Sequence, residues 1–142
     1  MLRLSLAVAA AVTLFAPDPA PAQDLQLRDR FDIPVYPIDA NSFEVVENDG
    51  AGGTQLWCAA GTYVREVLRQ RRGSIYILEA RGDSRAEPGR KSVVFTTQPI
   101  DNAFYSVSQG VRRSGKTFTA VHAYALCGDT PQLHIIVDGE RF

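Results

Sequence analysis

The chain has two cysteines, Cys58 and Cys127, and a covalent bond between them would constrain its fold more than any other feature. In an exported protein an even pair of cysteines is most simply a structural disulfide. The chain-entropy model gives a bridge that closes a loop of about 70 residues a stabilisation of about 4 kcal/mol. Two buried free thiols and a redox pair are the alternatives, although redox pairs are usually close in sequence, as in C-x-x-C.

The disulfide prediction depends on export, and residues 1–22 have the pattern of a signal peptide. Arg3 supplies a positive charge, and the uncharged run 4–16 has the length of a signal-peptide apolar core. Ala20 and Ala22 form an A-x-A pattern, so we expect cleavage after Ala22. A membrane-spanning helix needs about 20 apolar residues, and this run is shorter. An uncleaved amphipathic or membrane anchor is the alternative.

Export predicts a periplasmic or extracellular location, and the composition of the mature chain narrows the function further. Residues 1–22 contain one basic and one acidic residue, so the mature chain keeps the net charge of −1. A nucleic-acid-binding protein usually has a clearly basic balance, so we expect no nucleic-acid partner. No stretch after residue 22 is apolar for long enough to span a membrane, so no transmembrane segment is expected in the mature chain.

The mature chain divides into a short leading segment and one domain. Residues 23–41 are expected to form an extended N-terminal segment, because Pro34 and Pro37 disfavour helix there. This segment either packs across the domain or forms a flexible arm that a partner orders. Residues 42–142 are predicted as a single α+β domain, which is long enough to bury a hydrophobic core.

One long amphipathic helix is predicted over residues 55–70, where apolar residues recur at spacings of three and four. Thr54 precedes the helix as a candidate N-cap, and Gly73 suits the residue just past its end. Cys58 falls in the first turn of this helix. The disulfide would therefore fasten the N-terminal end of the helix to the end of a strand.

Residues 48–53 (Asn, Asp, Gly, Ala, Gly, Gly) form a turn and loop signal in front of the predicted helix. They match neither G-x-G-x-x-G nor G-x-x-x-x-G-K-[ST], so a phosphate-loop interpretation is rejected. A helix N-terminus can still bind an anion through its free backbone N–H groups.

A period of two follows the helix and predicts strands separated by turns. The predicted strands cover residues 43–47, 74–80, 92–97, 104–111, 117–127 and 133–137. A strand, then a helix, then strands joined by short turns predicts one main helix packed on a mainly antiparallel sheet of about five to six strands.

The two histidines, His122 and His134, are both predicted on strands. A four-residue turn at 128–131 would put them on opposite faces of the sheet, and a five-residue turn would reverse this. A zinc site needs three or four ligands, and no third is evident, so we expect no metal and no cofactor. No serine lies in a G-x-S-x-G elbow and the disulfide leaves no free cysteine, so no catalytic residue is assigned.

Basic residues gather in two predicted loops, which would form one positive patch if the loops share an edge of the domain. The residues are Arg81, Arg85, Arg90, Lys91, Arg112, Arg113 and Lys116. Such a patch would bind a protein or another anionic partner, such as a polyanion or an anionic lipid surface. Ordinary solubility of charged loops is the alternative.

Export, a rigid disulfide-closed frame and the lack of a reactive motif together predict a non-catalytic binding or interaction protein. The alternative is a small exported enzyme, hydrolase-like, whose site is assembled from residues far apart in the sequence. A deep pocket that holds His122 or His134 beside a carboxylate or a serine would favour the enzyme.

Overall fold

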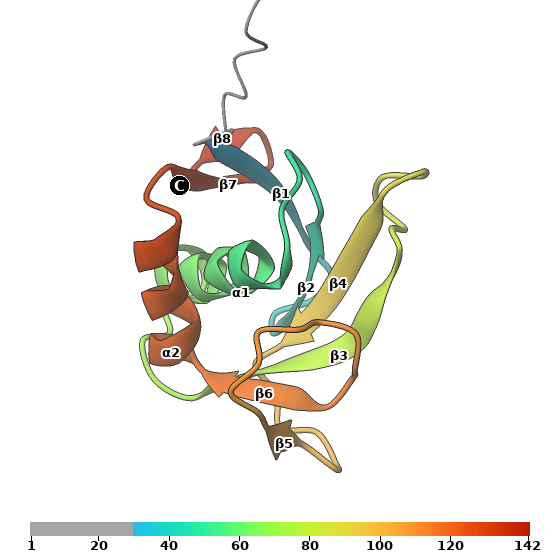
Figure 1. Ribbon diagram of the computed structural model, residues 1–142, viewed down its shortest axis with the longest axis vertical. Coiled ribbons are helices and arrows are strands. Elements are labelled where there is room, and N and C mark those ends of the chain that lie inside the picture. The colour runs from blue at the N-terminus through green and yellow to red at the C-terminus, as the bar shows by residue number, and fades with distance from the viewer. Residues whose placement is uncertain (1–29) are drawn as a thin grey trace, which may run out of the picture.

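The computed structural model of the protein describes residues 30–142, which form helices packed on one eight-stranded sheet (Figure 1). The predicted signal peptide, its cleavage site and residues 23–29 lie outside the described residues. The strands are β1 (Phe31–Pro37), β2 (Ser42–Val46), β3 (Ser74–Asp83), β4 (Lys91–Thr96), β5 (Phe104–Tyr105), β6 (Lys116–Thr119), β7 (Leu133–Val137) and β8 (Glu140–Arg141). The helices are α1 (Gly53–Thr62) and α2 (Ala120–Ala125), each extended by a short helix of another type, the π-helix η1 (Tyr63–Val67) and the 3₁₀ helix η2 (Leu126–Asp129).

The predicted α+β class is confirmed, but the sheet is larger than five to six strands and is mixed. Its strand order is β5-β6-β3-β4-β2-β1-β7-β8. β1 pairs in parallel with β7, so that Ile33 lies opposite Ile135, and β5 pairs in parallel with β6. The prediction missed β1 because it treated that part of the chain as a segment outside the sheet. β1 instead joins β2 to the C-terminal strands, which enlarges the sheet.

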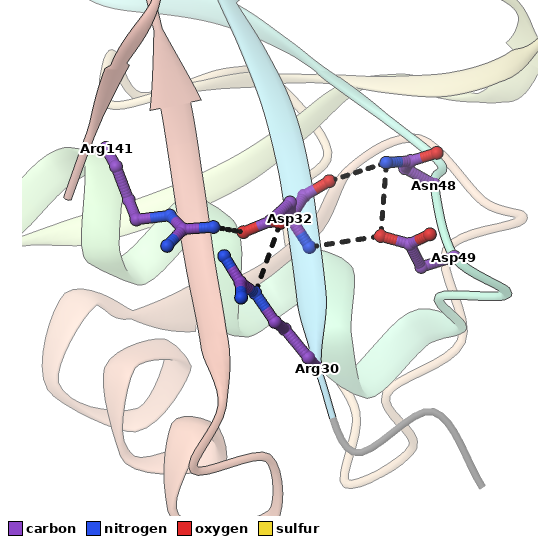
Figure 2. A network of polar contacts seen from close by, with 5 residues as sticks. All are labelled: Arg30, Asp32, Asn48, Asp49 and Arg141. Atoms are coloured by element: carbon purple, nitrogen blue, oxygen red, sulfur yellow. Dashed lines mark hydrogen bonds and ion pairs between the residues drawn. The ribbon is translucent and has the colours of Figure 1, made fainter. Parts of the chain in front are cut away.

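A polar network fixes β1 in this position (Figure 2). The backbone of Asp32 donates to the Asp49 carboxylate at 3.2 Å and accepts from the Asn48 side-chain amide at 2.8 Å. The Asp32 carboxylate pairs with Arg30 at 3.3 Å and with Arg141 of β8 at 2.7 Å. The loop after β2 and the C-terminal strand therefore both hold the start of β1, which is an integral strand rather than a flexible arm.

The predicted helix is confirmed as α1, although it begins earlier than expected, with Gly52 rather than Thr54 as its N-cap. It also ends earlier, because α1 stops at Thr62 and η1 at Val67, well before Gly73. α1 lies in the concave side of the curved sheet, with α2 beside it (Figure 1). All its residues from Leu56 to Thr62 are buried. The Trp57 ring packs against Phe95 of β4 and Phe118 of β6, with ring centroids 5.0 Å and 4.4 Å away. α1 is thus the centre of the hydrophobic core.

The predicted strand over residues 117–127 is wrong in its second part, because β6 ends at Thr119 and α2 follows it. The Thr119 hydroxyl accepts a hydrogen bond from the His122 backbone at 3.1 Å, which is an N-cap contact. Alanine, the strongest helix former, occupies three of the six positions in the segment Ala-Val-His-Ala-Tyr-Ala. The predicted strand 104–111 is also shorter, since only Phe104–Tyr105 pairs with a neighbour.

The predicted Cys58–Cys127 disulfide is confirmed, and neither cysteine is free. The expectation that it joins the helix to the end of a strand is wrong. Cys127 lies in η2, so the bridge joins α1 to the helical segment that follows α2. The reason is the helix at residues 120–125, which replaces the second part of the expected strand.

Candidate functional site

A cleft of about 470 Å³ opens where α1 begins, and we call it the α1 cleft. One wall is the start of α1 at residues 51–53, together with Glu47 just after β2. The other wall comes from the loop between β5 and β6, at residues 108–113, and from Arg81 and Lys116 on the adjacent strands. Segments far apart in the sequence therefore form a single concave surface.

Close backbone contacts position the β5–β6 loop against α1. A Cβ atom at Gly53 would lie 2.1 Å from the carbonyl oxygen of Gln109, so only glycine allows the loop to approach the helix this closely. On the other side, the Arg81 backbone N–H donates to the Val111 carbonyl at 2.9 Å. The loop is therefore held between α1 and β3, and its arginines are placed at the cleft.

Lys116 is the buried cation of the α1 cleft, with 5% of its surface exposed. Its ammonium donates to the carbonyl oxygens of Ser108 at 2.9 Å and Gly110 at 2.7 Å. Within residues 30–142 no carboxylate pairs with it. Burial lowers the pKa of Lys116, and the nearby charge of Arg113 lowers it further. Since a lysine ammonium has three N–H donors, one remains after the two carbonyl contacts.

Two exposed arginines, Arg112 and Arg113, lie beside Lys116 in the lining of the cleft. The Arg113 guanidinium stacks over the Phe104 ring, 4.5 Å from its centroid, which restricts where its charge can lie. Neither arginine forms an ion pair with another side chain in the described part of the protein. Arg81 differs, because its guanidinium makes two hydrogen bonds to the Glu47 carboxylate, and the hydrogen bond raises the pKa of Arg81.

The start of α1 adds backbone donors to the same cleft. Gly52, the N-cap, has no side chain that accepts from the first-turn N–H groups. The Gln55 side chain instead accepts from the Gly52 N–H at 3.0 Å. The positive end of the α1 dipole therefore lies at the cleft wall. The glycine-rich stretch was the sequence signal for this wall, but it fits no phosphate-loop motif, and only the fold places it opposite the basic loop.

The other basic residues of the predicted patch do not line the α1 cleft. Arg85 makes two hydrogen bonds to the Glu79 carboxylate, at 2.8 and 2.7 Å. Arg90 pairs with Glu87 at 2.9 Å, and Lys91 pairs with Asp83. The structure thus brings together Arg81, Arg112, Arg113 and Lys116. In contrast, Arg85, Arg90 and Lys91 lie along the β3–β4 hairpin beside carboxylates.

A second cleft of about 640 Å³ lies beside the disulfide, and we call it the disulfide cleft. Cys127, Thr62, Glu66 and His134 are among the residues that line it. Nδ1 of His134 is buried without a hydrogen-bond partner among the described residues. The Thr62 hydroxyl is already engaged, since it donates to the Cys58 carbonyl at 2.9 Å.

His122 lies on α2 rather than on a strand, so the expected alternatives for its place in a sheet are both wrong. Its ring stacks on Phe118, with centroids 4.3 Å apart, and it lines neither cleft. In residues 30–142, no group of three or more His, Cys, Asp or Glu side chains is placed to hold a metal ion.

Comparison with protein-family models, with curated proteins and with solved structures finds no match for this chain. Within the described residues, no helix has both the length and the apolar character that crossing a membrane requires.

Proposed function

We propose that this protein is an exported, non-catalytic binding protein that binds an anionic ligand in the α1 cleft. The observation that carries the proposal is the buried ammonium of Lys116, which has carbonyl partners but no carboxylate partner in the described chain. Lysine is almost never fully buried unless it is paired. Burying an ion costs several kcal/mol, and a ligand of opposite charge would offset that cost.

The charge around Lys116 supports the same proposal. The whole chain has a net charge of −1, yet Arg112, Arg113 and Lys116 meet in one concave site. Positive charges outnumber the one carboxylate, Glu47, in the lining, and a cleft with such an excess attracts ligands of the opposite sign. The protein therefore has a local positive potential that its net charge does not indicate.

The side chains of the α1 cleft favour binding over catalysis. Glu47 is the one carboxylate among the lining residues, and it is held by Arg81. Ser108 is the one hydroxyl, and it accepts from the Gly110 N–H at 3.1 Å. A nucleophile needs a general base within hydrogen-bonding distance, and no histidine or second carboxylate lines this cleft.

We place this binding protein in the periplasm or outside the cell. The Cys58–Cys127 disulfide is compatible with an oxidising compartment, where such bonds persist. Residues 1–22 supply the predicted export signal.

The test is titration calorimetry of the mature chain with phosphate, citrate and an acidic peptide, at low and high salt. We expect at least one of these anions to bind, and salt to weaken the binding by screening. The double variant Arg112→Ala/Arg113→Ala should weaken it by about tenfold or more, because charge-assisted hydrogen bonds are lost. Arg72→Ala is the control, since Arg72 is exposed and does not line the cleft. Absence of binding, or equal loss in the control, contradicts the proposal.

A small exported hydrolase is the second candidate function, favoured by the disulfide cleft. His134 and Glu66 line this cleft together, which is the combination expected of an enzyme site. The Glu66 carboxylate also forms an ion pair with Arg65 at 3.1 Å. A panel of chromogenic esters tests this candidate: turnover that His134→Ala abolishes, in a folded variant, would support the hydrolase over the binding protein.

A further inference from the structure

The donors of the α1 cleft come from different directions. The Lys116 ammonium comes from β6, Arg112 and Arg113 come from the β5–β6 loop, and backbone N–H groups come from the start of α1. A carboxylate is planar and offers two oxygens with one charge. A phosphate group offers three strong acceptor oxygens and about −1.5 to −2 charges at pH 7. The number, direction and charge of the donors therefore match a phosphate better than a carboxylate.

Glycines give such a group access to these donors. A Cβ atom at Gly110 would lie 3.3 Å from the Ser108 hydroxyl and 3.7 Å from the Lys116 ammonium. The absence of a side chain at Gly110 therefore leaves the space beside the ammonium open. On the opposite wall Gly52 also lacks a side chain that would cover the start of α1, whereas the space beside Gly53 is filled by the Gln109 carbonyl.

The Glu47–Arg81 pair gives the cleft a second, different chemistry. The Glu47 carboxylate has about four lone-pair positions, and Arg81 occupies two of them. The remaining positions accept hydrogen bonds from hydroxyl groups. The negative charge of Glu47 also repels a second acidic group of a ligand. The lining therefore fits one strongly anionic group joined to a neutral, hydroxylated body, rather than a polyanion.

The size of the cleft points the same way. Its volume of about 470 Å³ falls within the range of about 300–1,000 Å³ that is usual for small organic ligands. A free inorganic ion would leave the Glu47 side of the cleft without a ligand group.

We infer that the ligand of the α1 cleft is a phosphate monoester of a small polyhydroxylated molecule, such as a sugar phosphate. The phosphate binds Lys116, Arg112, Arg113 and the start of α1, and the hydroxyl groups donate to Glu47. This inference rests on the proposed function and specifies the chemical class of its ligand.

Calorimetry with matched probes tests the ligand class. The probes are a hexose 1-phosphate, inorganic phosphate, inorganic sulfate, the free hexose, and gluconate, which places a carboxylate on a similar hydroxylated body. We expect the hexose phosphate to bind about tenfold or more tightly than any other probe, because it alone combines a phosphate for the basic side with hydroxyl groups for Glu47. Gluconate or an acidic peptide that binds as tightly overturns the ligand class but leaves the proposed function intact. If no anion binds, both fail.

Two variants separate the two sides of the cleft. Arg112→Ala should weaken every phosphate probe by about tenfold, whereas the control Arg72→Ala should weaken none. Glu47→Gln should reduce the preference for hexose phosphate over inorganic phosphate by about tenfold, because the carboxylate acceptor is lost. The emission of Trp57, which is fully buried, reports that each variant is folded. An unchanged preference in a folded Glu47→Gln protein overturns the assignment of the hydroxyl groups. Should Glu47→Gln not fold, the wild-type preference for hexose phosphate over inorganic phosphate tests the assignment instead, and its absence overturns it.

Discussion

Gly61 of α1 packs directly on the backbone of Tyr124 in α2, where a Cβ atom would lie 2.4 Å from the Tyr124 nitrogen. Real Cβ atoms do not make such short contacts, so glycine is what allows the two helices to approach this closely. The disulfide between Cys58 and Cys127 ties α1 to η2, directly after α2. The two features together hold α2 against α1, whose other end forms a wall of the α1 cleft.

Helix propensity and packing predict opposite effects for Gly61→Ala. Alanine is favoured over glycine in a helix interior by about 1 kcal/mol, whereas overpacking of a core costs about 1–3 kcal/mol. Because the atoms in contact are backbone and cannot rotate away, we expect packing to dominate. The free energy of unfolding should fall by about 2 kcal/mol, measured by urea denaturation with the emission of the single tryptophan, Trp57.

Gly128→Ala is the matched control for this prediction. Gly128 lies in η2, and a Cβ atom there would meet nothing within 4 Å. We expect its unfolding free energy to stay within about 0.5 kcal/mol of the wild-type value. A Gly61→Ala protein that is as stable as the control would contradict the close approach of the two helices.

Local sequence patterns predicted α1 and several strands, because the periodicity that defines each lies in neighbouring residues. The disulfide was predictable because the chain has only two cysteines. α2 was missed for a physical reason. Val121 and Tyr124 favour strands, and the period of two that places His122 on one face with Phe118 and Tyr124 looked like a continuation of β6. The capping contact from Thr119 to His122 and the alanines of this segment outweigh that preference. A threonine followed by an alanine-rich stretch was the local signal for this helix.

The α1 cleft shows a second limit of sequence reasoning. Its basic residues were candidates from composition, but their grouping depends on contacts between distant segments. Arg81 joins the cleft because its backbone N–H bonds to Val111, 30 positions away in the numbering, whereas Arg85 on the same hairpin turns to Glu79. Gly53 contributes to the cleft because its close contact with Gln109 brings the β5–β6 loop against α1. Such long-range pairings are set by the packing of the sheet around α1, which no local pattern encodes.

The disulfide makes a quantitative prediction for stability. Cys58 and Cys127 are 69 residues apart in sequence, and closing a loop of this size in the unfolded chain contributes about 4 kcal/mol in the chain-entropy model. The double variant Cys58→Ser/Cys127→Ser should lose about this amount in urea denaturation. The native protein should show no free thiol before reduction. Reactive thiol in the unreduced protein, or a double variant as stable as wild type, would exclude a structural bridge.

Glu44 of β2 predicts an acid-dependent loss of stability. It is 4% exposed, and its carboxylate accepts from the Arg85 N–H at 3.0 Å and the Ala86 N–H at 3.3 Å. Burial alone would raise the pKa of Glu44, but these bonds and those from Ser84 and Ser92 outweigh it, so the pKa lies below its ordinary value of 4.5. A lowered carboxyl pKa stabilises the fold above about pH 4.5, and this stability is lost as the pH falls through the folded-state value.

Glu44→Gln tests the role of that carboxylate. The amide replaces one acceptor oxygen with a donor that faces backbone N–H groups, so we expect a loss of about 2 kcal/mol at pH 7. The variant should also lose less stability than wild type between pH 5 and about pH 3. Glu140→Gln is the control, because Glu140 is exposed on β8. If both variants lose as much stability at acid pH as wild type, the Glu44 carboxylate is not the source of that loss.

Lys116 predicts how ligand affinity depends on pH. Burial, and then the charge of Arg113, lower the pKa of Lys116 below its ordinary value of 10.5. A bound phosphate favours the charged ammonium and therefore raises this pKa in the complex. A group whose pKa rises on binding takes up a proton when the ligand binds. The affinity is therefore greatest below the pKa of Lys116 in the free protein, and it falls as the pH rises through that pKa toward the ordinary value of 10.5.

Calorimetry of hexose 1-phosphate binding between about pH 7 and pH 10 checks this, since a phosphate monoester with a second pKa of about 6 stays dianionic throughout. Two buffers of different ionisation enthalpy should reveal proton uptake in the alkaline part of the range. The matched variant is Lys116→Arg, because a guanidinium does not titrate there. Its affinity should not change with pH. A decline equal to that of wild type would mean that another group titrates, and that the Lys116 ammonium does not contact the anion.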